Sequence, residues 1–439
     1  MKNIARPVRV YALRPEAIAQ LPASSAPPPK AAAQSLVAPR LSIVVLPFAN
    51  LSNDPEQQYF ADGIAEDLTT DLSRIAEMLV ISGNTAFTYR NKPTDTKQIG
   101  RELCVRYVLE GSVRRSGNRV RVNAQLIDAE RDAHLWADRF DGDTSDLFTL
   151  QDEITSRIAV TLNLELLGAE AARPTEHPDA LDYILRGRAV LLKPQTRTTQ
   201  REAIDLFERA LALDPQFVEA QSRLAITLAG RALDFESSSE DADIQRAEDL
   251  AANAVAASPS NALGRFAKAQ VLRVRRRCAK AIPEYEAALA VNRNWVDALA
   301  AIGRCKIYIG PIEEGIAAQQ QAIRLSPRDP SIWRWSYRIG EAHLLLSRID
   351  DAILSLEKAR NANPAPAYIH AFLAAAYALR GETERAFVEL AEARRLGDVG
   401  AYSSIARART LTRYETEKIR ALCEATLFAG LRKAGMPEE

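Results

Sequence analysis

The chain has 439 residues, of which 47% are hydrophobic and 26% are charged. This composition is typical of a globular protein with room for two or three cores, and it excludes a disordered or collagen-like chain. The 57 basic and 57 acidic residues cancel, so no net charge attracts the chain to nucleic acid or to an acidic membrane. Aromatic residues make up only 6%, which favours closely packed helices over β-sandwiches or barrels.

Several kinds of site and segment have no support in the sequence. The first 20 residues lack the apolar core of a signal peptide, and no run approaches the roughly 20 apolar residues of a membrane span. Phosphate-binding loops and the HExxH, GxSxG and GxGxxG patterns are absent. The cysteines form no CxxC pair, so we expect no metal site and a reducing, cytoplasmic location. Because the catalytic motifs are absent, we also expect no catalytic residue and no cofactor. The cysteines are Cys104, Cys278, Cys305 and Cys423.

The first half of the chain alternates strand and helix patterns after a linker. Residues 21–40 are rich in proline, alanine and serine, which is typical of a flexible linker. The apolar run at 42–48 predicts a buried strand. Helical spacing at 59–75 predicts an amphipathic helix, and residues 78–82 return to a strand pattern.

The next segment predicts a helix, a hairpin and a further strand. Thr94-Asp95 can cap a helix that runs to Leu103. Residues 107–115 and 119–128 alternate apolar and polar side chains around a Ser-Gly-Asn turn, as in a hairpin with one packed face. A strand at 134–140 and an amphipathic helix at 146–167 follow, which completes an α/β unit with a mixed sheet.

An acidic group in this unit raises the alternative of a metal or general-acid site. Its spacing is more typical of a helix start, where acidic residues are favoured by the helix dipole, followed by a solvated helix face at Asp67 and Asp71. We therefore expect a local structural role for the group. Its members are Asp54, Glu56, Asp62, Glu66, Asp67 and Asp71.

The second half of the chain repeats itself. Similar helical segments end at positions 215, 259, 293, 327, 364 and 398, at intervals of 44, 34, 34, 37 and 34 residues. Three of these intervals equal the tetratricopeptide period. Small residues recur where paired helices must approach, and Gly310 and Gly381 stand where a turn favours positive φ. The excess of the first interval falls near residues 234–241, where we expect a solvated acidic insertion.

Two longer stretches resemble known protein families. The segments SIVVLPFANLSNDPEQQYFADGIAEDLTTDL and YVLEGSVRRSGNRVRVNAQLIDAERDAHLWADRFD resemble the TolB-like α/β domain of bacterial signalling proteins. In that family the module is non-enzymatic and commonly precedes tetratricopeptide repeats. The resemblance therefore implies the domain order that the residue patterns also predict.

The two ends of the chain resemble parts of class III adenylate/guanylate cyclases of the rhizobial type. KNIARPVRVYAL at the amino end is similar to the last strand of the cyclase domain, and ALCEATLFAGLRKAGMPEE is similar to the carboxyl end of the same proteins. The metal-binding aspartates and the transition-state Asn and Arg of such a domain have no counterpart in this sequence. The resemblance thus implies a regulatory chain that lacks the catalytic domain.

A candidate partner-binding surface follows from aligning the repeats by their small residues. The alignment places side chains of three successive first helices on one inner surface, which in tetratricopeptide proteins generally binds extended peptides. Arginines there can form forked bonds to a carboxylate, so we expect an acidic or carboxyl-terminal peptide. The alternative is that these arginines pair with Glu residues of adjacent helices. The candidate residues are Phe266, Arg273, Arg304, Arg334, Tyr337 and Glu341.

A nucleic-acid function is the third hypothesis. Arg273 and Arg275–Arg277 form a basic run, but no aromatic residues for base stacking flank it, and no winged helix or second basic patch is visible. A solvated helix end is the better interpretation, so we expect no nucleic-acid partner.

The sequence therefore predicts a non-enzymatic regulatory or scaffold protein, related to adenylate cyclase signalling, that binds protein partners and can dimerise. The alternative is that the chain is the regulatory part of an active cyclase whose catalytic domain lies upstream of Met1. The expected fold is a TolB-like α/β domain with a mixed sheet followed by an all-α tetratricopeptide solenoid. The predicted segments are a cyclase-strand remnant (1–20), the linker (21–40), the TolB-like domain (41–168), about six repeats (174–400) and a carboxyl-terminal helical segment (401–439).

Overall fold

In the computed structural model, residues Pro39–Glu439 begin with a mixed sheet and continue as a series of paired helices. The structure describes residues 38–439 apart from 53–57, 76–77, 91, 93–94, 117, 144–146, 174–177, 194–195, 234–238, 328, 398–399 and 413. The predicted cyclase-strand remnant and all of the predicted linker except its last three residues lie outside the described residues. So do Asp54 and Glu56 of the acidic group and residues 234–238 of the predicted insertion.

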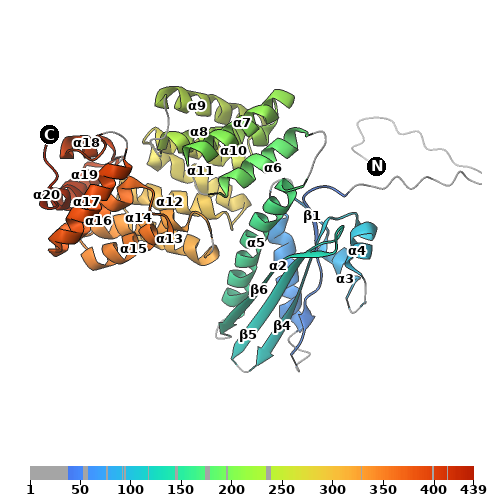
Figure 1. The fold of residues 1–439 in the computed structure, drawn as a ribbon. Coiled ribbons are helices and arrows are strands. Elements are labelled where there is room, and N and C mark those ends of the chain that lie inside the picture. Colours follow the sequence, from blue (N-terminus) through green and yellow to red (C-terminus); the bar gives the residue numbers. More distant parts are fainter. Residues whose placement is uncertain are drawn as a thin grey trace, which may run out of the picture. The chain divides into compact units, whose positions relative to one another are not determined.

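The first part of the described chain, which we call the sheet region (residues 38–173), contains a mixed sheet (Figure 1). β1 lies between β3 and β4 and is parallel to both, whereas β4, β5 and β6 pair antiparallel. β2 also pairs with β4. The strands are β1 (Ser42–Val45), β2 (Ala49–Asn50), β3 (Leu79–Val80), β4 (Tyr107–Ser116), β5 (Arg119–Asp128) and β6 (Ala133–Asp143).

The predicted hairpin is confirmed as β4 and β5, with Ser116 paired to Arg119. Along β5 the side chains of Val120, Val122 and Leu126 are buried, whereas Arg119 and Arg121 are exposed. The buried face packs against α2 (Gln58–Leu72) and α5 (Leu147–Ala171), which lie side by side on this face (Figure 1). The alternating pattern therefore gives the hairpin one packed face, as expected.

The opposite face of the sheet is covered over β1 and β4. Val44 and Val108 pack there with residues of the short α3 (Gly83–Phe87) and of α4 (Thr96–Leu103). The Asp95 side chain accepts a hydrogen bond from the Lys97 backbone N–H, which confirms the predicted cap of α4. Covering on both faces explains why β1 is an apolar run without alternation.

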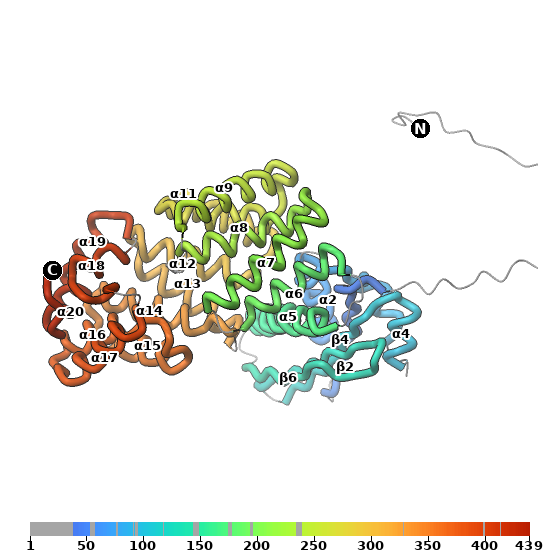
Figure 2. Tube along the Cα trace, turned by 45° about the horizontal axis from the view of Figure 1, so that its top comes forward, coloured from blue at the N-terminus to red at the C-terminus, as the bar shows by residue number. Residues whose placement is uncertain are grey.

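Twelve helices of the described chain form six antiparallel pairs, which we call the repeat region (residues 178–397; Figures 1 and 2). Each second helix ends where the repeated sequence pattern predicts. Gly310 and Gly381 have φ values of 136° and 93°, as their turns require. The pairs are α6 (Ala180–Leu191) with α7 (Arg197–Leu213), α8 (Val218–Leu233) with α9 (Glu240–Ala257), α10 (Ala262–Val274) with α11 (Cys278–Val291), α12 (Val296–Ile309) with α13 (Ile312–Leu325), α14 (Ile332–Leu345) with α15 (Ile349–Ala362), and α16 (Ala367–Arg380) with α17 (Thr383–Leu396).

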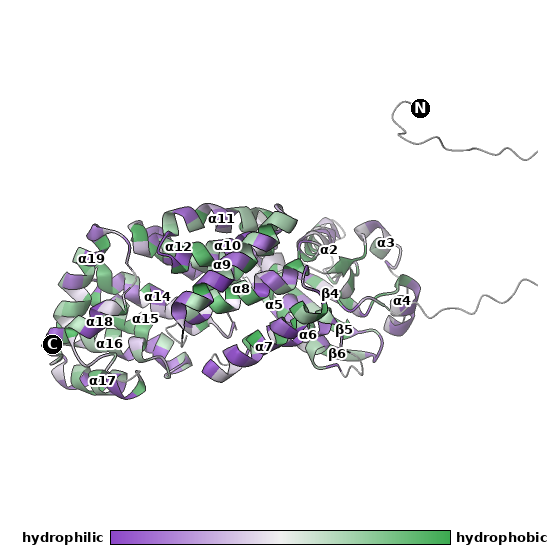
Figure 3. Cartoon of the chain, turned by 90° about the horizontal axis from the view of Figure 1, so that it is seen from above, coloured by the Kyte–Doolittle hydropathy of each residue, from purple (hydrophilic) through white to green (hydrophobic). Residues whose placement is uncertain are grey.

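The core of the repeat region is built from small and aromatic side chains. Ala281, Ala352 and Ala386 are fully buried between paired helices, and Gly340 faces Leu356 of the next helix so closely that a Cβ atom would lie 2.6 Å from it. The Trp295 ring stacks on Phe266 at 4.6 Å. The helices carry both apolar and polar residues (Figure 3). The second helix α15 buries one stripe of side chains, as an amphipathic solenoid helix requires, at Ala352, Ile353, Leu356 and Ala359.

A carboxyl-terminal segment completes the described chain and packs on the last repeat. Backbone hydrogen bonds from Ile405 and Ala406 to Pro437 and Glu438 close it into a small unit. Its last helix lies against α16. The segment contains α18 (Ile405–Thr410), α19 (Glu417–Cys423), the π-helical turn η2 (Glu424–Phe428) and α20 (Ala429–Lys433).

One expectation for the acidic group is wrong. Asp71 does not lie on a solvated helix face but is 2% exposed. It accepts hydrogen bonds from Asn294 Nδ2 at 2.8 Å and from Arg293 Nε and Nη2 at 3.2 Å. These partners lie between α11 and α12, more than 200 positions away, so no local pattern could reveal them. Asp71 thus ties the sheet region to the repeat region.

Candidate functional site

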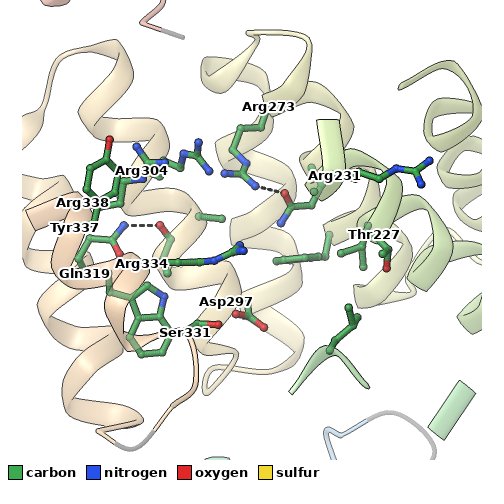
Figure 4. Close-up of a pocket in the computed structure, with 18 of the residues that line it drawn as sticks. Thr227, Arg231, Arg273, Asp297, Arg304, Gln319, Ser331, Arg334, Tyr337 and Arg338 are labelled. Atoms are coloured by element: carbon green, nitrogen blue, oxygen red, sulfur yellow. Dashed lines mark hydrogen bonds between the residues drawn. The ribbon is translucent and has the colours of Figure 1, made fainter. Parts of the chain in front are cut away.

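The inner surface of the repeat region contains a cavity of about 260 Å³. Five of the six candidate residues line it, and Arg273, Arg304 and Arg334 project toward it from three successive first helices (Figure 4). Its lining residues belong to α6–α8, α10, α12–α14 and α16 and to the start of α14 at Ser331. We call this cavity the arginine groove.

Two of the three predicted arginines, Arg273 and Arg304, are held by neutral groups. Arg273 donates to the Gln270 side chain, and its buried Nε has no hydrogen-bond partner among the described residues. Arg304 Nε donates to the Tyr308 hydroxyl at 3.0 Å. Within the described residues, neither Arg273 nor Arg304 forms an ion pair with a glutamate, so the alternative of Arg–Glu pairing does not describe these two.

Two further arginines line the groove and were missed by the sequence alignment. Arg231 of α8 binds Asp243 at 2.5 Å, and Arg338 of α14 binds Glu341 at 2.7 Å. The long first interval obscures the alignment of α8. Arg338 directly follows Tyr337 on α14. Adjacent residues of a helix do not face the same way, so the alignment that placed Tyr337 on the inner surface gave no reason to place Arg338 there.

The electrostatic balance of the arginine groove is positive, because its arginines outnumber the carboxylates that line it or bind to them. Five arginines line it, whereas Asp297 is the one carboxylate among its described lining residues. Asp243 and Glu341 neutralise two of the arginines but do not themselves line this cavity. Several guanidinium groups that converge on one cavity favour an anion with forked acceptor oxygens, such as a carboxylate.

Asp297 gives the groove a pH dependence that can be tested. Asp297 is exposed, and the groove walls beside it together with the carboxylate of Asp329 raise its pKa to about 6. Above this pH the ionised group cancels one positive charge. We expect the dissociation constant of an acidic peptide to be roughly threefold higher at pH 8 than at pH 5.5. This is the size of effect expected from the repulsion between one ionised carboxylate and the peptide in a hydrated groove. Titration by fluorescence anisotropy measures this.

The variant Asp297→Asn is the control for this prediction. It removes the ionisable group and should bind at both pH values as tightly as the wild type binds at pH 5.5. A variant that retains the full pH dependence would show that another group is responsible.

Glu341 is the candidate residue that does not line the arginine groove. It is 2% exposed and lines a second cavity of about 80 Å³. There Glu341 accepts hydrogen bonds from Arg338 and from the Tyr414 hydroxyl. Its carboxylate is therefore already occupied by residues of this chain.

Two similarities of sequence bear on the function. Residues 39–157 match the family of the HilA/YgeH-like transcriptional regulator, second domain. The putative adenylate cyclase 3 of Rhizobium meliloti (strain 1021) is 43% identical over 232 residues, which is 52% of this chain and 38% of that protein. The chain therefore spans well under half of this curated relative, and half of it is homologous to a protein with a cyclase name.

Solved structures resemble the chain more distantly. A thermophilic TPR protein of Thermus thermophilus is 20% identical with a TM-score of 0.36, covering 45% of this chain and 98% of its own. TolB from Acinetobacter baumannii is 19% identical with a TM-score of 0.22, covering 30% of this chain and 29% of its own. The strand order and the helix pairing described above therefore carry the assignment of the fold.

The described part of the chain gives two further findings. None of its helices has the length and apolar character that crossing a membrane requires. No group of three or more histidine, cysteine, aspartate or glutamate side chains within it is arranged to hold a metal ion.

Proposed function

We propose that this chain is a non-enzymatic regulatory protein of adenylate cyclase signalling whose arginine groove binds an acidic segment of a partner protein. The observation that carries the proposal is the charge of the groove, which has five arginines against one carboxylate among its described lining residues. The homology to a protein named as an adenylate cyclase supports the signalling context. In this proposal the partner is a cytoplasmic protein.

The geometry of the groove supports a peptide rather than a small ion as its ligand. Lining residues come from α6 at one end to α16 at the other, so the ligand site extends across the inner helices of all six pairs. Phe266, Trp335 and Tyr337 add apolar surface between the charged groups. An extended chain can present acidic side chains to the arginines and apolar groups to these rings.

The triple variant Arg273→Ala, Arg304→Ala, Arg334→Ala tests the proposal. A hexaglutamate peptide with fluorescein on its amino end serves as the probe, and fluorescence anisotropy at constant ionic strength gives the dissociation constant. We expect the triple variant to bind at least tenfold more weakly, because charge-assisted hydrogen bonds contribute about 1.5–3 kcal/mol each.

A charge-matched variant separates this effect from net charge. Arg201→Ala, Arg324→Ala and Arg407→Ala remove three exposed arginines from α7, α13 and α18, and they should leave the affinity within about twofold, which is the effect of distant screened charges. Equal affinity of the groove variant and the wild type would refute the proposed site.

A second candidate function is that the chain is the regulatory part of an active cyclase. The observation that favours it is that this chain spans only 38% of the putative adenylate cyclase 3. The intact mass of the protein from its native host distinguishes the two. A mass near 48.4 kDa supports the first function, and a mass larger by a cyclase-sized domain supports the second.

A further inference from the structure

The arginine groove continues toward the last repeat and is then covered by the chain itself. The second cavity, which contains Glu341, shares Arg304, Tyr337, Arg338 and Tyr368 with the arginine groove. Unlike the groove, it is also lined by carboxyl-terminal residues. A surface that would otherwise run on across the first helices is thus closed beyond Tyr337.

Tyr414 is the side chain at this closure. It is 4% exposed, its hydroxyl donates to Glu341 at 2.8 Å, and its ring packs edge to face against Tyr308 with centroids 5.4 Å apart. Tyr308 and Glu341 belong to α12 and α14, so Tyr414 spans two neighbouring repeats. A bulky aromatic residue therefore fills the space into which a through-running peptide would continue.

Glu415 fastens the same loop to a third repeat. Its carboxylate oxygens accept the backbone N–H of Cys278, the first residue of α11, at 2.9 and 3.1 Å. The N-cap residue of this 14-residue helix makes no side-chain cap hydrogen bond, so Glu415 supplies the acceptor and the negative charge that a helix start favours. The Glu415 backbone N–H also lies 3.3 Å from the Tyr308 carbonyl oxygen.

Positive charge is concentrated on the open side of this closure. Arg304 Nε and Arg338 Nη1 both donate to the Tyr308 hydroxyl, at 3.0 and 2.9 Å. Each guanidinium has five N–H donors, and the contacts with Tyr308 and Glu341 use only some of them. The arginine groove therefore ends in two guanidinium groups with donors left for a ligand.

We propose that Tyr414 and Glu415 act as a stop, so that the arginine groove accepts its partner by a free carboxyl-terminal end. The terminal carboxylate lies at Arg304 and Arg338, and Tyr414 excludes any residue beyond it. This inference rests on the proposed function, and it adds that the carboxyl-terminal loop of this chain determines which peptides fit.

Two fluorescent hexaglutamate peptides test the stop in the full chain. One carries fluorescein on its amino end and the other carries it on its carboxyl end, so the second presents a bulky group where a free carboxylate is required. We expect the amino-labelled peptide to bind at least tenfold more tightly. Equal affinities would overturn the stop and leave the proposed function standing, whereas no binding of either peptide would contradict both.

Two substitutions of Tyr414 locate the selectivity. Tyr414→Phe removes only the hydroxyl and should keep the tenfold preference, because the ring still blocks the groove. Tyr414→Ala opens the space and should bring the two affinities within about twofold of each other. A preference that persists in Tyr414→Ala, in a variant whose circular dichroism matches the wild type, would assign the block to another residue.

Discussion

Replacing Glu170 by alanine is expected to lower the free energy of unfolding by about 3–5 kcal/mol, which is the usual cost of breaking a buried ion pair from one side. The Glu170 side chain is 1% exposed and lies 2.8 Å from Arg106 Nη1. It also accepts a hydrogen bond from the Tyr107 hydroxyl at 2.5 Å, and Arg173 Nε lies 3.2 Å away. Without it, Arg106 and Tyr107 lose their acceptor where α5 ends against β4. Urea unfolding followed by circular dichroism measures the change.

Glu165→Ala is the matched control on the same helix. Glu165 is exposed, so its replacement should change the free energy of unfolding by no more than about 0.5 kcal/mol. A Glu170→Ala variant that is equally mild would mean that the Arg106 and Tyr107 contacts do not anchor this helix.

The second large effect is expected from Gly430→Ala in α20. A Cβ atom at this position would lie 2.5 Å from the Ala375 carbonyl oxygen and 2.7 Å from the Ala375 Cα atom in α16. These are backbone atoms, so the two helices must separate rather than a side chain rotate. Overpacking of this kind costs about 3 kcal/mol, and thermal unfolding should show a lower midpoint.

The same substitution at Gly168 is expected to raise the stability of the protein rather than lower it. Gly168 lies in α5, and nothing stands within 4 Å of a Cβ atom added there. Alanine has the higher helix propensity, so this variant should gain up to about 1 kcal/mol. If both variants lost stability equally, the close approach of α20 to α16 could not be the cause in Gly430→Ala.

Local patterns were sufficient for most of the fold. The hairpin, the cap at Asp95 and the ends of the repeated helices each depend on residues within a few positions of one another, and each is confirmed. β2 and α3 were not predicted. β2 is a strand of two residues that exists because it pairs with β4, and α3 has five residues, so neither is long enough to show a period.

The candidate site was predictable only where the repeat period carried the information. Arg273, Arg304 and Arg334 stand at different positions of the repeat, but the alignment of successive first helices places them on one inner surface, and they line one cavity. No sequence pattern indicates that Tyr414 covers Glu341, because that contact joins residues 73 positions apart. The burial of Asp71 could not be predicted for the same reason, because the residues that hydrogen-bond to its carboxylate in place of water lie in another part of the chain.

The contact between Glu415 and the start of α11 has a consequence for how the repeats unfold. A linear array of repeats touches only its neighbours and can fray from its free end, one unit at a time. Here a bond across 137 positions ties the carboxyl-terminal loop back to the third helix pair, and one continuous core runs from Phe266 to Met436. We therefore expect the last four helix pairs, which this loop joins into a closed ring of contacts, to unfold in one cooperative step.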